Sequence, residues 1–113
     1  MQKHNNLNKI NNLKTKIMRK ITQESIDAFN SNETFSKSNT TVSVTDTTTI
    51  LLLHGNSIAY KDRETGKIEI TNCGWDTPTT KERLNGLDGV AIRQRQGKWY
   101  LNGDLWDGEL IQI

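Results

Sequence analysis

Short apolar stretches alternate with tight-turn signals from Thr49 to Ile113, and this pattern restricts what the chain can fold into. The turn signals are Gly55-Asn56, the loop 62–66 that ends in Gly66, Gln96-Gly97 and Asn102-Gly103. Asparagine and glycine tolerate the positive φ angles that a two-residue hairpin turn needs. Strands joined by such short turns run antiparallel, because a parallel pair needs a long crossover. The sequence therefore predicts an antiparallel sheet of about five or six strands.

A short helix interrupts these strands. Thr77 is placed to cap it with Pro78 at its first position, or Thr79 and Glu82 form a capping box. The dipeptide Asn85-Gly86 marks its end. We expect an α+β fold in which this one short helix packs on the antiparallel sheet.

Residues 1–30 carry a helical pattern. Apolar side chains recur every three or four residues from Leu7 to Ile21, and Thr22 is placed to cap a second helix over about 23–30. We expect two helices or one bent helix. This helical N-terminal arm precedes the α+β domain.

Residues 31–48 are rich in Ser, Thr and Asn and hold few large side chains. This composition predicts an exposed linker, with room for a short edge strand at 41–44, where Val42 and Val44 alternate. The predicted organisation is an arm over 1–30, a linker over 31–48 and a small α+β domain over 49–113.

Positive charge is concentrated at the N-terminus. Residues 1–21 hold six basic and no acidic side chains, a charge of +6, whereas residues 22–113 hold nine basic and thirteen acidic side chains, a charge of −4. A basic segment attracts polyanions by Coulomb forces that salt screens. The arm is therefore predicted to contact nucleic acid through Lys9, Lys14, Lys16, Arg19 and Lys20.

Two other interpretations of the arm remain. A basic amphipathic helix also binds anionic membrane surfaces or protein grooves, including a second copy of itself. The polar face of the arm is mostly asparagine, which weakens the nucleic-acid case, and it has no Trp or Phe, which argues against deep membrane insertion. A helix that docks on another protein, or one that joins copies of this chain into a homo-oligomer, fits the pattern about as well as a nucleic-acid contact does.

Composition excludes several classes of protein. Apolar residues make up 33% of the chain and the longest apolar run is Ile50 to Leu53, so no membrane span is expected. The single cysteine, Cys73, excludes an internal disulfide and a Cys-based zinc site. No glycine-rich phosphate loop, zinc-protease helix or serine nucleophile elbow is present. We expect no cofactor and no metal.

Catalytic candidates are few. His54 lies at a strand end before Gly55 and lacks companion metal ligands, so a turn-stabilising role is favoured. Cys73 with His54 as base would make a nucleophilic pair, but the sequence shows no orienting third group, and a small buried thiol is the simpler interpretation. The carboxylates are scattered. A small hydrolase that uses His54 is a third, weaker hypothesis, and we expect no enzyme.

Two groups of cations in the domain are candidates for phosphate contacts. Lys81 and Arg83 follow the start of the short helix, whose free amides favour anions, although an ordinary capped helix is the simpler interpretation. Arg93 and Arg95 alternate on one strand face, and Lys98 follows on the next strand. Such a face can grip phosphates while nearby tryptophans stack bases.

The tryptophans have a competing role in the core. The chain has only two Phe and two Tyr, so few large side chains are available to fill an interior. We therefore expect Trp99 and Trp106 to be core residues rather than exposed stacking surfaces.

Much of the chain resembles a family of small tailed-bacteriophage proteins. The segments that carry the resemblance include Leu53-His54-Gly55-Asn56 and Trp99-Tyr100-Leu101-Asn102-Gly103, and in full they are 23–29, 39–40, 53–59, 74–87, 99–103 and 106–108. The resemblance runs in one order from about residue 20 to 108. It implies a phage accessory protein made inside an infected bacterium, in the cytoplasm or packaged in the virion. The family has no assigned activity, so the resemblance carries no catalytic residue over to this chain.

The residues and the resemblance together predict a non-enzymatic phage accessory module that binds nucleic acid. The alternative is a protein-binding factor that inhibits or modulates a host or phage protein, or a minor virion component.

Overall fold

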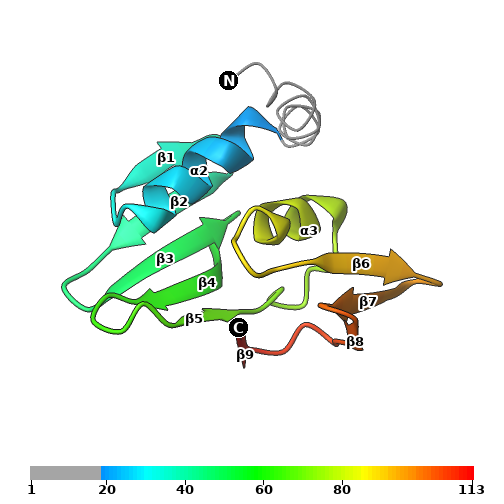
Figure 1. The fold of residues 1–113 in the computed structure, drawn as a ribbon. Helices are drawn as coiled ribbons and strands as arrows, with labels where there is room; N and C mark the ends of the chain where they lie inside the picture. Colours follow the sequence, from blue (N-terminus) through cyan, green and yellow to red (C-terminus); the bar gives the residue numbers. More distant parts are fainter. Residues whose placement is uncertain (1–18) are drawn as a thin grey trace, which may run out of the picture.

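The computed structural model describes residues 19–113, which form two antiparallel sheets and two helices (Figure 1). The predicted α+β fold with an antiparallel sheet and an N-terminal helix is confirmed. In chain order the elements are α2 (Lys20–Asn30), β1 (Phe35–Lys37), β2 (Thr40–Val44), β3 (Thr48–Leu53), β4 (Asn56–Asp62), β5 (Ile68–Ile70), α3 (Pro78–Asn85), β6 (Ile92–Arg95), β7 (Lys98–Leu101), β8 (Asp104–Leu105) and β9 (Ile111–Gln112).

The larger sheet has six strands in the order β1-β2-β3-β4-β5-β9. Along β3, Thr49, Leu51 and Leu53 are buried and the residues between them are half-buried, so one face of the sheet holds the core. The turn after β3 is formed by His54 and Gly55, with φ of 52° and 80°. It lies one residue earlier than the Gly55-Asn56 position expected from the sequence.

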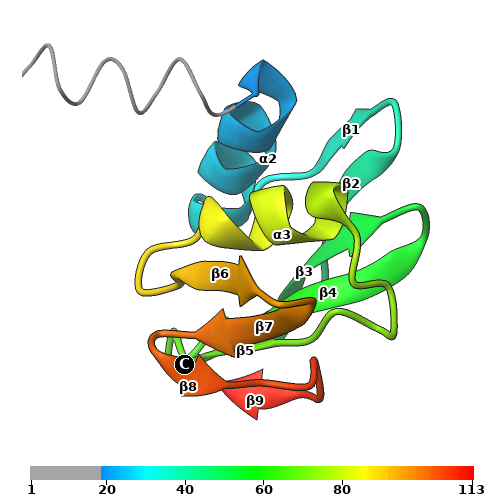
Figure 2. The same ribbon diagram turned by 90° about the vertical axis from the view of Figure 1, so that its right-hand side faces the viewer.

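Helix α2 packs against β1, β2 and β3 and buries Ile26 and Phe29 in the core (Figure 2). The expected cap at Thr22 is not formed, because the helix begins at Lys20 and Thr22 lies inside it, fully buried. The Thr22 carbonyl accepts a hydrogen bond from Ser25 Oγ at 2.9 Å. The first part of the predicted arm, up to residue 18, lies outside the described residues.

Lys61 of β4 caps the carboxyl end of α2. Its Nζ donates to the carbonyl oxygens of Phe29 at 2.7 Å and Asn30 at 3.1 Å, and lies 5.2 Å from the centroid of the Phe29 ring. A cation is favourable at the negative end of the helix dipole. Burial, with a smaller contribution from Arg63, lowers the pKa of Lys61 below its usual value. These contacts anchor the end of α2 to the middle of the sheet.

Residues 31–48 do not form the expected linker. They supply β1 and β2, and β2 pairs with both β1 and β3, so it is an interior strand rather than an edge strand. Thr40 and Val42 are buried where α2 crosses β2. Small threonine and valine side chains fit beneath a helix that lies directly on the strand, and this explains why the strand carries so weak an apolar signal.

The smaller sheet consists of β6, β7 and β8. Its two hairpin turns are Gln96-Gly97 and Asn102-Gly103, all four residues at positive φ, as the sequence predicted. Thr77 caps α3 by accepting a hydrogen bond from the amide of Thr80, with Pro78 at the first helical position, which is the first of the two predicted alternatives.

Helix α3 lies between the two sheets and contacts β4 and β6 (Figure 2). Asn85 at its end fixes the start of β6: the amide nitrogen donates to the Ile92 carbonyl at 3.1 Å, and the amide oxygen accepts from the Ile92 N–H at 2.7 Å. Neither described helix has the length and apolar character that a membrane crossing requires.

Two tryptophans join the smaller sheet to the core. Trp99 and Trp106 are 4% and 7% exposed, with ring centroids 6.2 Å apart, so the predicted core role is confirmed. The indole nitrogen of Trp106 donates to the Glu109 carbonyl at 2.9 Å, whereas that of Trp99 is buried with no partner in residues 19–113. Trp75, in contrast, is 58% exposed.

Candidate nucleic-acid interface

The register of β6 and β7 gathers three of the predicted cations on one face of the smaller sheet. Arg93 pairs with Tyr100, and Arg95 pairs with Lys98 across the hairpin. Directly opposed residues point to the same side of a sheet, as do residues two apart on a strand. We call the surface formed by Arg93, Arg95, Lys98 and Tyr100 the basic face.

The opposite side of the same strands is directed into the molecule. Ile92 and Trp99 alternate with the residues of the basic face and are 4% exposed. Arg93, Arg95 and Lys98 are all exposed. Because Ile92 and Trp99 are packed in the core on one side of the strands, the cations on the other side point into solvent.

No salt bridge within residues 19–113 involves Arg93, Arg95 or Lys98. No carboxylate occupies a position of the basic face in the β6–β7 register. At one margin, Lys98 shares a hollow with Asp76 and Asp107. The positive charge of the face is thus least compensated at the two arginines.

Tyr100 gives the basic face an aromatic member. It is half-buried, and the β7–β8 register places Leu105, 64% exposed, opposite it. Aromatic rings stack unpaired bases, and guanidinium groups form charge-assisted hydrogen bonds with phosphate. Sequence reasoning missed Tyr100 and Leu105, although the two hairpin turns fix a register that would have identified both.

The remaining predicted cations do not join the basic face. Lys81 extends from α3 to the inner side of β6, where its Nζ donates to Gln94 Oε1 at 3.3 Å. Arg19 and Lys20 are exposed at the start of α2, and Arg19 Nε lies 3.7 Å from Glu82 Oε1. The predicted contacts Lys9, Lys14 and Lys16 lie outside the described residues.

Arg83 is a structural residue rather than a surface cation. It is 1% exposed, and NH1 donates to Glu82 Oε1 at 2.6 Å and to Thr22 Oγ1 at 2.7 Å, while Nε donates to Thr40 Oγ1 at 3.1 Å. Burial lowers the pKa of Arg83, and Glu82 opposes that shift. A phosphate cannot reach this guanidinium, so the expected phosphate site built from Lys81 and Arg83 is not assembled.

Cys73 and His54, the nucleophilic pair that the sequence did not favour, each contact another residue, and Cys73 is exposed rather than buried as expected. Cys73 Sγ donates to the Ser57 carbonyl at 2.9 Å, and partial burial of the thiol raises its pKa, which favours its unreactive protonated form. His54 Nε2 lies 3.5 Å from Asn39 Nδ2. Residues 19–113 contain no cluster of three or more His, Cys, Asp or Glu side chains able to hold a metal ion.

Comparison with known proteins gives one match. A protein-family model described as "Kyanoviridae Gp96 protein" matches residues 18–112, which is most of the chain. No curated protein and no solved structure matches. The family match agrees with the resemblance to phage proteins found in the sequence.

Proposed function

Because the chain belongs to the Kyanoviridae Gp96 protein family, a family of phage proteins, we propose that it is a non-enzymatic accessory protein that binds single-stranded nucleic acid. The observation that carries the proposal is the basic face. There the strand register places two exposed arginines and an exposed lysine on the same side as a half-buried tyrosine, with the arginines free of salt bridges in residues 19–113.

The chemistry of the basic face suits an unpaired strand. Arg93 and Arg95 point from the same side of β6 and are two residues apart, so they can contact successive phosphates while Tyr100 stacks a base between them. A duplex offers phosphates but no unstacked base. We therefore expect single strands to bind more tightly than duplexes of the same length.

The test removes two charges from the basic face. In the full chain, the double variant Arg93→Gln/Arg95→Gln is expected to bind a fluorescein-labelled 20-nucleotide single strand about tenfold or more weakly at low salt. The slope of log affinity against log salt should become shallower by roughly 1.4, since each phosphate contact to a single strand contributes about 0.7. Fluorescence anisotropy between about 50 and 200 mM salt measures both quantities.

The control variant Lys37→Gln/Lys67→Gln removes the same charge from the edge and loop of the larger sheet. It should keep the slope and most of the affinity. If both double variants lost affinity equally, the attraction would be long-range and the basic face would not be a defined site. If the unmodified chain bound no single strand, the proposal would be wrong.

A second function, binding to a host or phage protein, is favoured by exposed apolar side chains near the C-terminus. Of the five large hydrophobic residues that are exposed within residues 19–113, four fall within residues 105–113: Leu105, Leu110, Ile111 and Ile113. Exposed apolar residues that gather in one region mark protein interaction sites. The basic face does not explain them.

This second function predicts a stoichiometric protein partner that co-purifies from infected cells after nuclease treatment. The variant Leu110→Asp/Ile113→Asp is expected to lose that partner, because a charge buried against apolar surface is strongly unfavourable. The variant Arg93→Gln/Arg95→Gln should retain it. Quantitative pull-down with the three proteins separates the two functions, and recovery of nucleic acid alone would count against a protein partner.

A further inference from the structure

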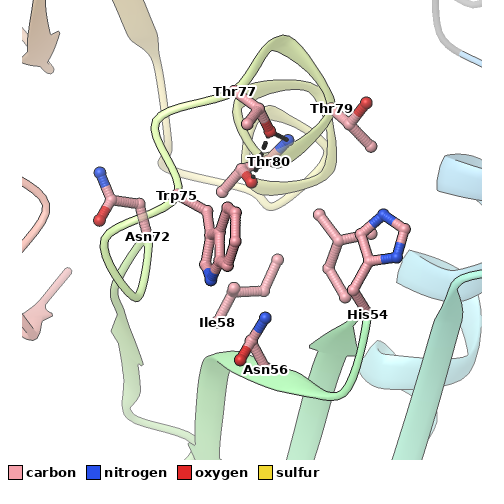
Figure 3. Close-up of a pocket in the computed structure, with 9 residues that line it drawn as sticks. His54, Asn56, Ile58, Asn72, Trp75, Thr77, Thr79 and Thr80 are labelled. Carbon is pink, nitrogen blue, oxygen red and sulfur yellow. Dashed lines mark hydrogen bonds between the residues drawn. The ribbon is translucent and has the colours of Figure 1, made fainter.

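A cavity of about 470 Å³ lies between the start of α3 and the turn that follows β3 (Figure 3). This volume falls within the range of roughly 300–1,000 Å³ that is typical of small-molecule sites. Leu53 and Ile58 supply apolar lining from the larger sheet, and Thr79 and Thr80 line the cavity from the helix. Trp75 and Asn72 line it from the segment that joins β5 to α3.

Trp75 presents its indole to this cavity instead of to the core (Figure 3). The main chain that carries it forms a turn: Cys73 and Gly74 have φ of 54° and 80°, and the Trp75 amide donates to the Asn72 carbonyl at 2.8 Å. The other two tryptophans are buried, whereas 58% of Trp75 remains in solvent. This large exposed aromatic ring offers a flat stacking surface at the mouth of the cavity.

The cavity lining carries no acidic side chain, lysine or arginine, and His54 is its only titratable residue. We therefore expect the part of a ligand that enters the cavity to be uncharged. Thr77 and Thr80 satisfy each other, with their hydroxyl oxygens 3.0 Å apart. Asn56, half-buried at the start of β4, extends its amide toward the cavity, as Figure 3 shows. An amide supplies both a donor and an acceptor, which matches the edge of a nucleobase.

We propose that this cavity binds an uncharged nucleobase, stacked on the Trp75 indole and hydrogen-bonded at its edge by Asn56. The base can belong to a free nucleoside or to an unpaired nucleotide of a bound strand. Only the second source rests on the function proposed above, because a free nucleoside needs no contact with the basic face.

The first test uses the full chain and the four nucleosides adenosine, guanosine, cytidine and uridine. We expect at least one of them to quench tryptophan emission in a saturable way, because Trp75 is the exposed indole among the three. Calorimetry should show that Trp75→Ala weakens this binding roughly 5- to 150-fold, the usual cost of losing one base–aromatic stack, and that Trp75→Phe costs less. The control Lys37→Gln/Lys67→Gln changes exposed side chains outside the cavity and should bind nucleosides normally.

A second arm identifies the source of the base. If the base belongs to a strand, Trp75→Ala also lowers affinity for the 20-nucleotide single strand; if it is a free nucleoside, that affinity does not change. The variant Arg93→Gln/Arg95→Gln should bind nucleosides like the unmodified chain. No saturable binding of any nucleoside, or equal binding by Trp75→Ala, overturns the cavity proposal and leaves the basic face to be judged by its own variants.

Discussion

Replacing Arg83 with alanine is expected to lower the free energy of unfolding by about 3–5 kcal/mol. Arg83 is almost fully buried and joins α3 to Thr22 of α2 and Thr40 of β2, both of which are fully buried as well. The substitution leaves a cavity and removes the donors from two buried hydroxyl groups. Proteins of this size have only about 5–15 kcal/mol of total stability, so the loss is a large fraction of it.

Two further variants separate packing from hydrogen bonding at this position. Arg83→Met fills most of the volume without donors and should lose less stability than Arg83→Ala. Arg83→Lys keeps the charge, but a lysine ammonium lacks the planar fork of donors with which arginine reaches two hydroxyl groups and a carboxylate. This variant should therefore also be destabilised. Urea unfolding followed by circular dichroism gives the three values. A loss below about 1 kcal/mol for Arg83→Ala would contradict the structural role described here.

Replacing Gly108 with alanine is expected to cost about 2–5 kcal/mol, from backbone strain and overpacking together. Gly108 has φ of 92°, and an added Cβ would overlap the Cγ, Oδ1 and Nδ2 atoms of the Asn72 side chain. The Asn72 side chain is held by its Oδ1, which accepts from the Gly74 amide at 2.8 Å, and its backbone N–H donates to the Gly108 carbonyl at 3.1 Å, so moving the side chain aside breaks the first of these bonds. Thermal and urea unfolding measure the effect.

Gly66→Ala is the matched control for this substitution. Gly66 also has positive φ, at 77°, but a Cβ there meets nothing within 4 Å. It should cost only the backbone term, about 1–2 kcal/mol. The difference between the two variants isolates the clash with Asn72. Because Asn72 lines the cavity beside Trp75, Gly108→Ala should also weaken nucleoside binding, and equal stabilities for the two variants would show that Asn72 yields easily.

Features fixed by neighbouring residues were predictable from the sequence. The Gln96-Gly97 and Asn102-Gly103 turns and the Thr77 cap of α3 depend on the conformational preferences of two to four consecutive residues, and all three are present. The exposed positions of Arg93 and Arg95 also follow from simple alternation along a strand.

Features that depend on distant partners were not predictable. From its neighbours in sequence, Arg83 looks like an exposed cation on a helix. Its burial depends on Thr22 and Thr40, which are 61 and 43 residues away in sequence. The alternation at 41–44 predicted a strand close to β2, but β1 and the interior position of β2 depend on the strands and the helix that pack against them. The cavity beside Trp75 is built from β3, β4 and the segment leading into α3, so no single stretch of sequence reveals it.

The buried hydrogen bonds by which Arg83 of α3 joins α2 and β2 also bear on how the chain folds. The chain must close a loop of about sixty residues before the Arg83–Thr22 hydrogen bond can form, whereas α2 and the strands that it covers are close in sequence. Long-range closures of this kind slow folding and expose apolar strands in the meantime. We therefore expect α3 to dock on α2 and β2 late in folding, after the local contacts of α2 with β2 and β3 have formed.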